Sequence, residues 1–145
     1  MVERATLFTV LAKLDNASAA SVVKGFGQVL HRIAAQQRLS LTYDQGREMA
    51  AHQKLTENTG MKVYFADPHS PWQRGINENT NGLLRQYFPK RTDLSGFTQI
   101  ELDAVAWQLN TRPRKSLGWK CPAELFMPDS SDFFQHHHQL VALRT

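Results

Sequence analysis

The sequence predicts an α/β fold, on three observations. Residues 5–14, 39–44 and 61–66 have the apolar and β-branched composition of strands. Residues 17–36 carry apolar side chains at helical spacing, and residues 47–58 are expected to form a shorter helix that Gly60 ends. Strands that alternate with helices in this order are typical of an α/β layer.

The first strand and helix rest on local composition. Residues 5–14 are short of turn formers, which predicts a strand buried on both faces, and Asp15 with Asn16 ends it. The helix over residues 17–36 is predicted in spite of Gly25 and Gly27. Its inward side chains are Ala19, Val22, Val23, Phe26, Val29, Leu30 and Ile33.

The second half of the chain is predicted to be helical. A loop over residues 68–75 precedes a helix that Pro89 ends, with Ile76, Thr80, Leu83, Leu84 and Tyr87 on one face and Glu78, Asn81 and Arg85 on another. Thr98 and Glu101 form a capping box for a further helix, whose inward residues are Leu102, Val105, Ala106 and Leu109. We expect one domain over residues 1–126 and a tail over residues 127–145.

The composition is that of a globular protein with a basic middle. The chain has 145 residues, 41% of them hydrophobic, and a net charge of +4, which suits a polyanionic partner but is also common in proteins that bind nothing acidic. Its single cysteine, Cys121, excludes an internal disulfide and is expected to be a packing residue rather than a nucleophile. Without a long apolar run or a signal sequence, a cytoplasmic protein is expected.

Two carboxylates are candidate metal ligands. Asp44 ends a predicted strand and Glu78 lies on a predicted helix, with 33 residues between them. Acids placed in this way can converge on the hard divalent cations, such as Mg²⁺, that support phosphoryl transfer. The alternative is that Asp44 caps the next helix and that Glu78 only complements a helix dipole.

A set of basic and aromatic residues, together with Asn81, are candidates for contact with DNA. They are Trp72, Arg74, Asn81, Arg85, Arg112, Arg114, Lys115 and, beside them, Trp119 and Lys120. The alternative is an ordinary solvated surface, with Trp119 packed in the core. The consecutive residues His136, His137 and His138 are expected to belong to a solvated tail.

Four phrases carry a resemblance to a known family. Residues 44–50, 64–75, 77–82 and 109–119 read DQGREMA, YFADPHSPWQRG, NENTNG and LNTRPRKSLGW. Together they resemble the IS-thirty family of bacterial insertion-sequence transposases, over roughly residues 2–126. The resemblance implies a ribonuclease-H-like integrase core that uses an Asp-Asp-Glu triad with Mg²⁺ or Mn²⁺ to cleave element ends and join them to target DNA.

The resemblance also assigns residues and partners. Asp44 matches the second acid of the triad and Glu78 the third, so both are expected to be catalytic and to bind the metal. Arg85 matches a basic residue expected to contact the DNA of the element's end. The expected partners are DNA and other transposase subunits, either copies of this chain in a homo-oligomer or intact transposase, and no membrane is expected.

The sequence departs from the family at its beginning. The first catalytic Asp of the family lies on a strand that precedes the segment starting here at Met1, and Asp15 reads as a helix cap rather than a substitute. An N-terminally truncated core is therefore expected, in which the missing central strand leaves a rearranged sheet, marginal stability or pairing with another chain.

The activity expected of such a core is low, with a rate loss of at least about 10³ for one missing ligand. Two alternatives stay open. One is a non-catalytic module that binds DNA or intact transposase, and the other is a reading frame that extends upstream of Met1.

Overall fold

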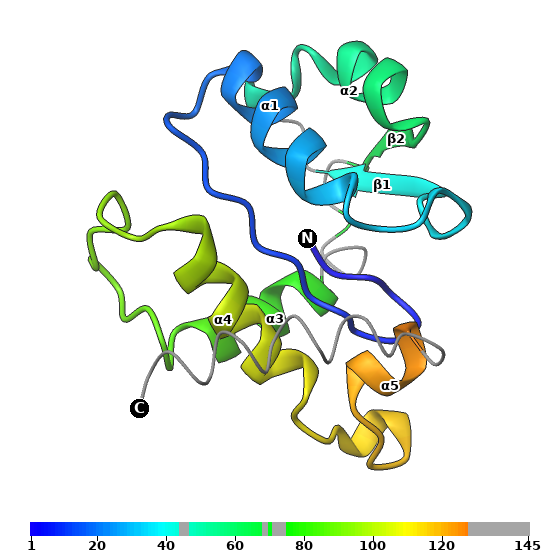
Figure 1. The fold of residues 1–145 in the computed structure, drawn as a ribbon, viewed down its shortest axis with the longest axis vertical. Coiled ribbons are helices and arrows are strands. Elements are labelled where there is room, and N and C mark those ends of the chain that lie inside the picture. The colour runs from blue at the N-terminus through cyan, green and yellow to red at the C-terminus, as the bar shows by residue number, and fades with distance from the viewer. Residues whose placement is uncertain (44–46, 68–69, 71–74, 128–145) are drawn as a thin grey trace.

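The computed structural model describes residues 1–43, 47–67, 70 and 75–127, and all structural statements below refer to these residues. One half of the molecule contains α1 (Ala19–Leu30), β1 (Ser40–Tyr43), α2 (His52–Thr59) and β2 (Lys62–Phe65). The other half contains α3 (Gly75–Leu84), α4 (Gln99–Asn110) and α5 (Pro122–Phe126). The N-terminal residues run between the two halves (Figure 1).

The first half is a small strand–helix–strand unit. β1 and β2 are parallel, in a register that pairs Ser40 with Lys62 and Tyr43 with Phe65. The connection between them contains a 3₁₀ turn (Arg47–Met49) and α2, which ends at Gly60 in the left-handed conformation with φ 74°. The two predicted strands, the helix between them and its glycine stop are therefore confirmed.

A hydrophobic core fills this half. Its buried members are Val22, Phe26, Leu30, Met49, Leu55 and Met61, contributed by α1, α2 and the residues next to them. α1 begins at Ser18, whose side chain accepts a hydrogen bond from the Ser21 amide. It ends earlier than the predicted residue 36, because the bonds after His31 shorten to i→i−3, from Arg32 to Val29 and from Ile33 to Leu30.

The prediction of a strand over residues 5–14 is wrong. Within the described part of the chain the sheet has only the strands β1 and β2, and near the N-terminus there is a single antiparallel bridge, between Val2 and Thr9. A turn lies between these two residues. The Glu3 carboxylate accepts bonds there from the amides of Ala5 (3.0 Å) and Thr6 (2.7 Å), and these bonds lower the pKa of Glu3 in spite of the raising effect of burial.

Side-chain amides of α4 take the place of a strand partner. Asn110 accepts a bond from the Thr9 amide at 2.7 Å and donates one to the Thr9 carbonyl at 2.8 Å. At the other end of the helix, Gln99 accepts from the Lys13 amide and donates to the Leu11 carbonyl, both at 2.8 Å. Residues 9–13 are thus extended and bonded to a helix through its side chains.

The second half packs around α4. The capping box of Thr98 and Glu101 is present, and Leu102, Ala106 and Leu109 are buried as predicted. Phe8 from the N-terminal segment stacks on Phe126 of α5, with ring centroids 4.4 Å apart.

The two halves are connected by polar and steric contacts. Arg32, just after α1, forms an ion pair with Asp103 on α4. Gly25 allows α1 to approach the N-terminal segment closely, since a Cβ there would lie 2.8 Å from the Lys13 carbonyl oxygen. Among the helices of the described ranges, none is long and apolar enough to cross a membrane.

Candidate nucleic-acid interface and acidic site

The structure describes one of the two predicted acids, Glu78, but not the other. Asp44 lies outside the described residues, but Tyr43 directly before it is the last residue of β1, and its carbonyl accepts a bond from the Ala66 amide at 2.8 Å. Glu78 lies in the first turn of α3 and is exposed. The convergence of the two carboxylates therefore remains a prediction. Nowhere in the described ranges do three or more metal-ligating side chains gather.

The predicted division of α3 into two faces is confirmed. Thr80 is buried, and Ile76, Leu83, Leu84 and Tyr87 are partly buried. Glu78, Asn81 and Arg85 are all exposed. The candidate acid and the two candidate DNA-contacting residues thus share the accessible side of one helix and its last turn, where the Arg85 amide bonds to the Asn81 carbonyl at 3.1 Å.

Residues 112–120, called here the basic loop, contain four cations and no acidic residue. The cations are Arg112, Arg114, Lys115 and Lys120. The Arg114 amide bonds to the Lys120 carbonyl at 3.1 Å, and the Trp119 amide bonds to the Arg114 carbonyl at 2.9 Å, so the loop is closed on itself. Trp119 is 69% exposed, and the alternative that it packs in the core is wrong.

The basic loop lies against α3 and its last turn. Arg112 donates a bond to the Gln86 side chain at 3.2 Å. A cavity of about 580 Å³ lies between the two elements and the N-terminal segment, lined by Asn79, Thr80 and Leu83 of α3, by Arg114, Lys115 and Ser116 of the basic loop, and by Leu7. Cations of the loop thus reach the helix that carries Glu78.

Arg114 is the least accessible cation of the loop. Its guanidinium donates a bond to the Leu109 carbonyl at 3.3 Å, while its Nε is buried without a hydrogen-bond partner. Burial, and then the neighbouring charge of Arg112, lower the pKa of Arg114. A guanidinium remains protonated at neutral pH in spite of such a shift, so Arg114 brings a poorly solvated positive charge to the cavity.

Two of the candidate DNA-contacting residues lie outside the described part of the chain, and some residues of the site were not predicted from the sequence. Trp72 and Arg74 lie outside the described residues, as does the His-rich tail. Sequence reasoning did not name Asn79, Gln86 or Ser116, because only the tertiary contact of the basic loop with α3 gives these residues a place in the site.

Cys121 does not have the environment of a nucleophile. Its Sγ donates a bond to the Thr111 carbonyl at 3.0 Å. Burial and the negative charge of Glu124 raise the pKa of the thiol, which disfavours the reactive thiolate. The prediction that Cys121 is a packing residue agrees with this environment.

The fold defines the class of protein. The chain matches the catalytic core domain of BIV integrase with a TM-score of 0.54 and 20% identity, over 83% of this chain and 77% of that one. At this identity the match shows the fold, which is the ribonuclease-H-like integrase core predicted from the sequence. No family model matches the chain.

Relatives at higher identity show which integrase-like proteins the chain resembles. It is 57% identical over 125 residues to the transposase for insertion sequence element IS1086 of Cupriavidus metallidurans, covering 86% of this chain and 37% of that protein. It is 50% identical, also over 125 residues, to transposase InsI for IS30A of Escherichia coli, covering 86% of this chain and 33% of that protein. The family resemblance is confirmed: the chain is a relative of the IS30-type insertion-sequence transposases and spans about a third of their length.

Proposed function

We propose that this chain carries part of the catalytic core of an insertion-sequence transposase, with Asp44 and Glu78 as acids of a metal-dependent reaction on DNA phosphodiesters. The observation that carries the proposal is the arrangement around α3. This helix exposes Glu78 and is followed directly by the exposed Arg85, and the turn after it is joined to the basic loop through Gln86. Glu78, an acid for metal binding, and Arg85, a cation for phosphate, therefore share the exposed side of α3, and the basic loop adds cations next to the Thr80 and Leu83 side of the same helix.

The available donor atoms fit a hard divalent cation. Glu78 offers exposed carboxylate oxygens, and no ion pair in the described part of the chain occupies them. Oxygen donors of this kind suit Mg²⁺ or Mn²⁺, with Asp44 as the proposed second ligand. When bound, such an ion would stabilise the negative charge that develops on the oxygens of a phosphodiester during cleavage or strand transfer.

The cations would position the DNA backbone. Arg85, Arg112 and Lys115 are exposed and suited to direct phosphate contacts, whereas the half-buried Arg114 is suited to a phosphate that enters the cavity. Asn81 would donate or accept a hydrogen bond beside Arg85, and Trp72 and Arg74 are proposed as further DNA contacts from their sequence context. Because its proposed substrate is bacterial DNA, we also propose a cytoplasmic location.

The test is the Glu78→Gln variant of the whole 145-residue chain. Mn²⁺ binding is measured by the spectroscopic signal of the free ion, and nicking is measured on DNA that carries an insertion-sequence end. We expect Glu78→Gln and Asp44→Asn each to weaken Mn²⁺ binding, and Glu78→Gln to abolish whatever turnover the chain has.

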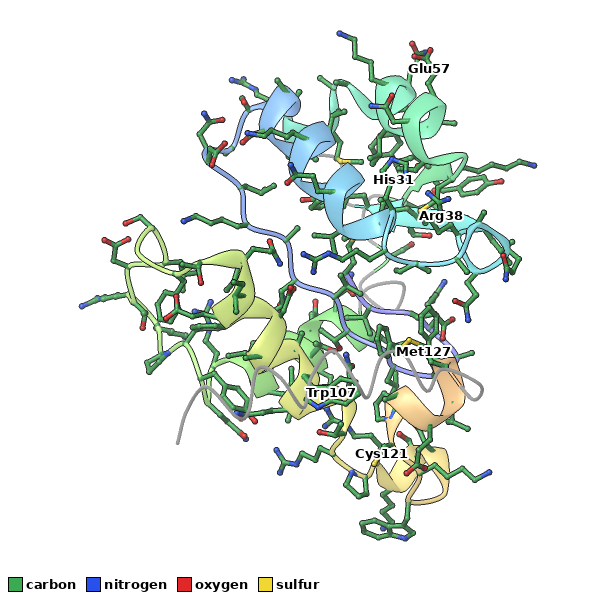
Figure 2. The ribbon with its side chains drawn as sticks, viewed as in Figure 1. His31, Arg38, Glu57, Trp107, Cys121 and Met127 are labelled. Atoms are coloured by element: carbon green, nitrogen blue, oxygen red, sulfur yellow. The ribbon has the colours of Figure 1, made fainter. Side chains whose placement is uncertain are left out.

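Glu57 provides a matched control. It is an exposed acid on α2, at the end of the molecule far from α3 (Figure 2). Glu57→Gln removes the same charge, so it should leave Mn²⁺ binding and turnover unchanged. Equal behaviour of Glu78→Gln and Glu57→Gln would refute the acidic site.

A non-catalytic module is the second candidate. The observation that favours it is the closed basic loop, which is complete within the described residues whether or not the acids converge. Such a module would bind DNA, and intact transposase subunits or a second copy of this chain, without turnover. DNA binding that is lost in an Arg112→Ala, Lys115→Ala double variant, together with no metal-dependent nicking, would support this candidate over the enzyme.

A further inference from the structure

Trp119 is the most exposed of the tryptophans in the described part of the chain. It is 69% exposed, whereas Trp107 lies on α4 and is partly buried (Figure 2). Its backbone has a φ of 67°, in the left-handed region that a bulky side chain rarely adopts. A large aromatic ring held outward by strained backbone is a feature that packing alone does not explain, because the same ring would be more stable if it were buried.

Hydrogen bonds fix the backbone that carries the Trp119 side chain. The Trp119 amide bonds to the Arg114 carbonyl at 2.9 Å, and the Lys120 amide bonds to the Leu117 carbonyl at 3.3 Å. Gly118 before it is also left-handed, with a φ of 63°. The tip of the basic loop is therefore a tight turn, and a ligand that stacks on the indole would have little loop motion to restrict.

The surroundings of Trp119 select the chemistry of that ligand. Arg112, Arg114, Lys115 and Lys120 place four positive charges within the same nine-residue loop, which has no acid. An aromatic platform flanked by cations is suited to a strand of nucleic acid, whose bases stack while its phosphates pair with Lys and Arg. Inside a duplex the base faces are covered by their neighbours, so the platform is suited to an unpaired base rather than to a base within the stack.

We propose that Trp119 stacks on an unpaired base of bound DNA, so that the basic loop distinguishes single-stranded segments from intact duplex. The proposal rests on the proposed DNA-binding surface and adds the structural state of the DNA that the surface selects. The flanking cations hold the phosphates on either side of the stacked base.

The test compares two labelled DNAs by fluorescence anisotropy. One is a blunt duplex, and the other is the same duplex with a short thymidine overhang. The parent chain is expected to bind the overhang DNA more tightly. Trp119→Ala should weaken that binding by about 5- to 150-fold, the usual effect of losing one stacked base, and change blunt-duplex binding by less than about 2-fold. Trp119→Phe, which retains a ring, should recover most of the loss.

An abasic overhang isolates the stacking contact. Overhang sugars without bases keep the phosphates, so the parent chain should bind this DNA as weakly as Trp119→Ala binds the normal overhang. Trp119→Ala should not distinguish the two overhangs. Ile100→Ala is the matched control, because Ile100 is 60% exposed but lies on α4, and it should bind every DNA as the parent does.

Other results of the DNA-binding test would contradict the stacking role of Trp119. Equal losses on blunt and overhang DNA, or no loss on either, would overturn the stacking role and leave the DNA surface in place. Self-association of the parent that Trp119→Ala abolishes would assign the ring to a protein contact instead. A parent chain that binds neither DNA would remove both this inference and the proposed DNA surface, whereas loss of the Glu78 effect alone would leave the inference standing.

Discussion

Two extended segments of this molecule satisfy their backbones in different ways. β1 pairs with β2 through main-chain bonds, in a ladder that runs from Ser40 and Lys62 to Tyr43 and Phe65. Residues 9–13 are also extended, but the partners of their backbone include the side-chain amides of Asn110 and Gln99 on α4. A ladder tolerates most side chains, whereas amide contacts depend on the identity of two residues.

The dependence is strongest where water is excluded. Asn110 is 2% exposed and Thr9 is 3% exposed, so their paired bonds cannot be replaced by solvent without opening the structure. A buried polar group that loses its partner costs more than the bond itself contributes in net terms. The N-terminal segment therefore depends on one side chain, that of Asn110. The strand pair does not depend to the same extent on any single side chain.

The largest effect is expected for Asn110→Leu. The substitution keeps the size of the side chain but leaves the Thr9 amide and carbonyl without their partners, at about 1–3 kcal/mol for each group. We therefore expect the free energy of unfolding in urea to fall by roughly 2–6 kcal/mol. Gln108→Leu, on the exposed side of the same helix, should change it by less than about 0.5 kcal/mol. Similar values for the two variants would contradict the importance of the amide contact.

A smaller effect is expected for Gly25→Ala, which tests how closely the N-terminal segment packs on α1. The new Cβ would lie 2.6 Å from Leu14 Cδ2 and 2.8 Å from the Lys13 carbonyl oxygen, which is backbone and has little freedom to move. We expect thermal unfolding to show a loss of about 1–3 kcal/mol from overpacking.

Gly27→Ala provides the control for this packing test, because a Cβ at Gly27 would meet nothing within 4 Å. Helix propensity then favours alanine by up to about 1 kcal/mol, so this variant should be stabilised. The two substitutions in one helix are expected to have opposite signs. A stabilised Gly25→Ala would show that the N-terminal segment can move away from α1.

The features predicted correctly from the sequence are those that depend on residues close together in the chain. Gly60 ends α2 because the left-handed conformation suits glycine, and Thr98 with Glu101 begins α4 through bonds between near neighbours. The prediction of a strand over residues 5–14 was wrong, because the apolar composition of a segment does not show whether a partner strand is present. The side-chain amide that binds Thr9 belongs to Asn110, 101 residues further along the chain, so no local sequence pattern indicates the contact.

In the candidate site, too, some features were predicted from the sequence and others were not. The exposed and buried faces of α3 follow from helical periodicity, so Glu78, Asn81 and Arg85 were placed together correctly. The exposure of Trp119 depends on how the basic loop closes through Arg114 and Lys120, and composition could not reveal it. The approach of Asp44 to Glu78 stays a prediction, because Asp44 lies outside the described residues.

Gln99→Leu should have a smaller effect than Asn110→Leu, although it also removes two bonds to the N-terminal segment. Gln99 is only partly buried, so water can replace its contacts with Leu11 and Lys13. We expect a loss of about 1 kcal/mol in the free energy of unfolding. Hydrogen exchange at the Lys13 amide should become faster, while the amides of β2 should keep their protection. Unchanged exchange at Lys13 would mean that Gln99 does not fix the segment.

The smallest effect is expected for Tyr64→Ser on β2. Tyr64 is 54% exposed and lies opposite Thr42 on β1, so its side chain contributes a cross-strand contact but none of the ladder bonds. Such a contact contributes roughly 0.2–1 kcal/mol, and a double-mutant cycle with Thr42→Ala measures it directly. Because the main-chain bonds remain, the strand pair should keep its hydrogen-exchange protection in Tyr64→Ser. If this variant instead destabilised the chain more than Gln99→Leu, the strand pair would depend on its side chains as strongly as the N-terminal segment does.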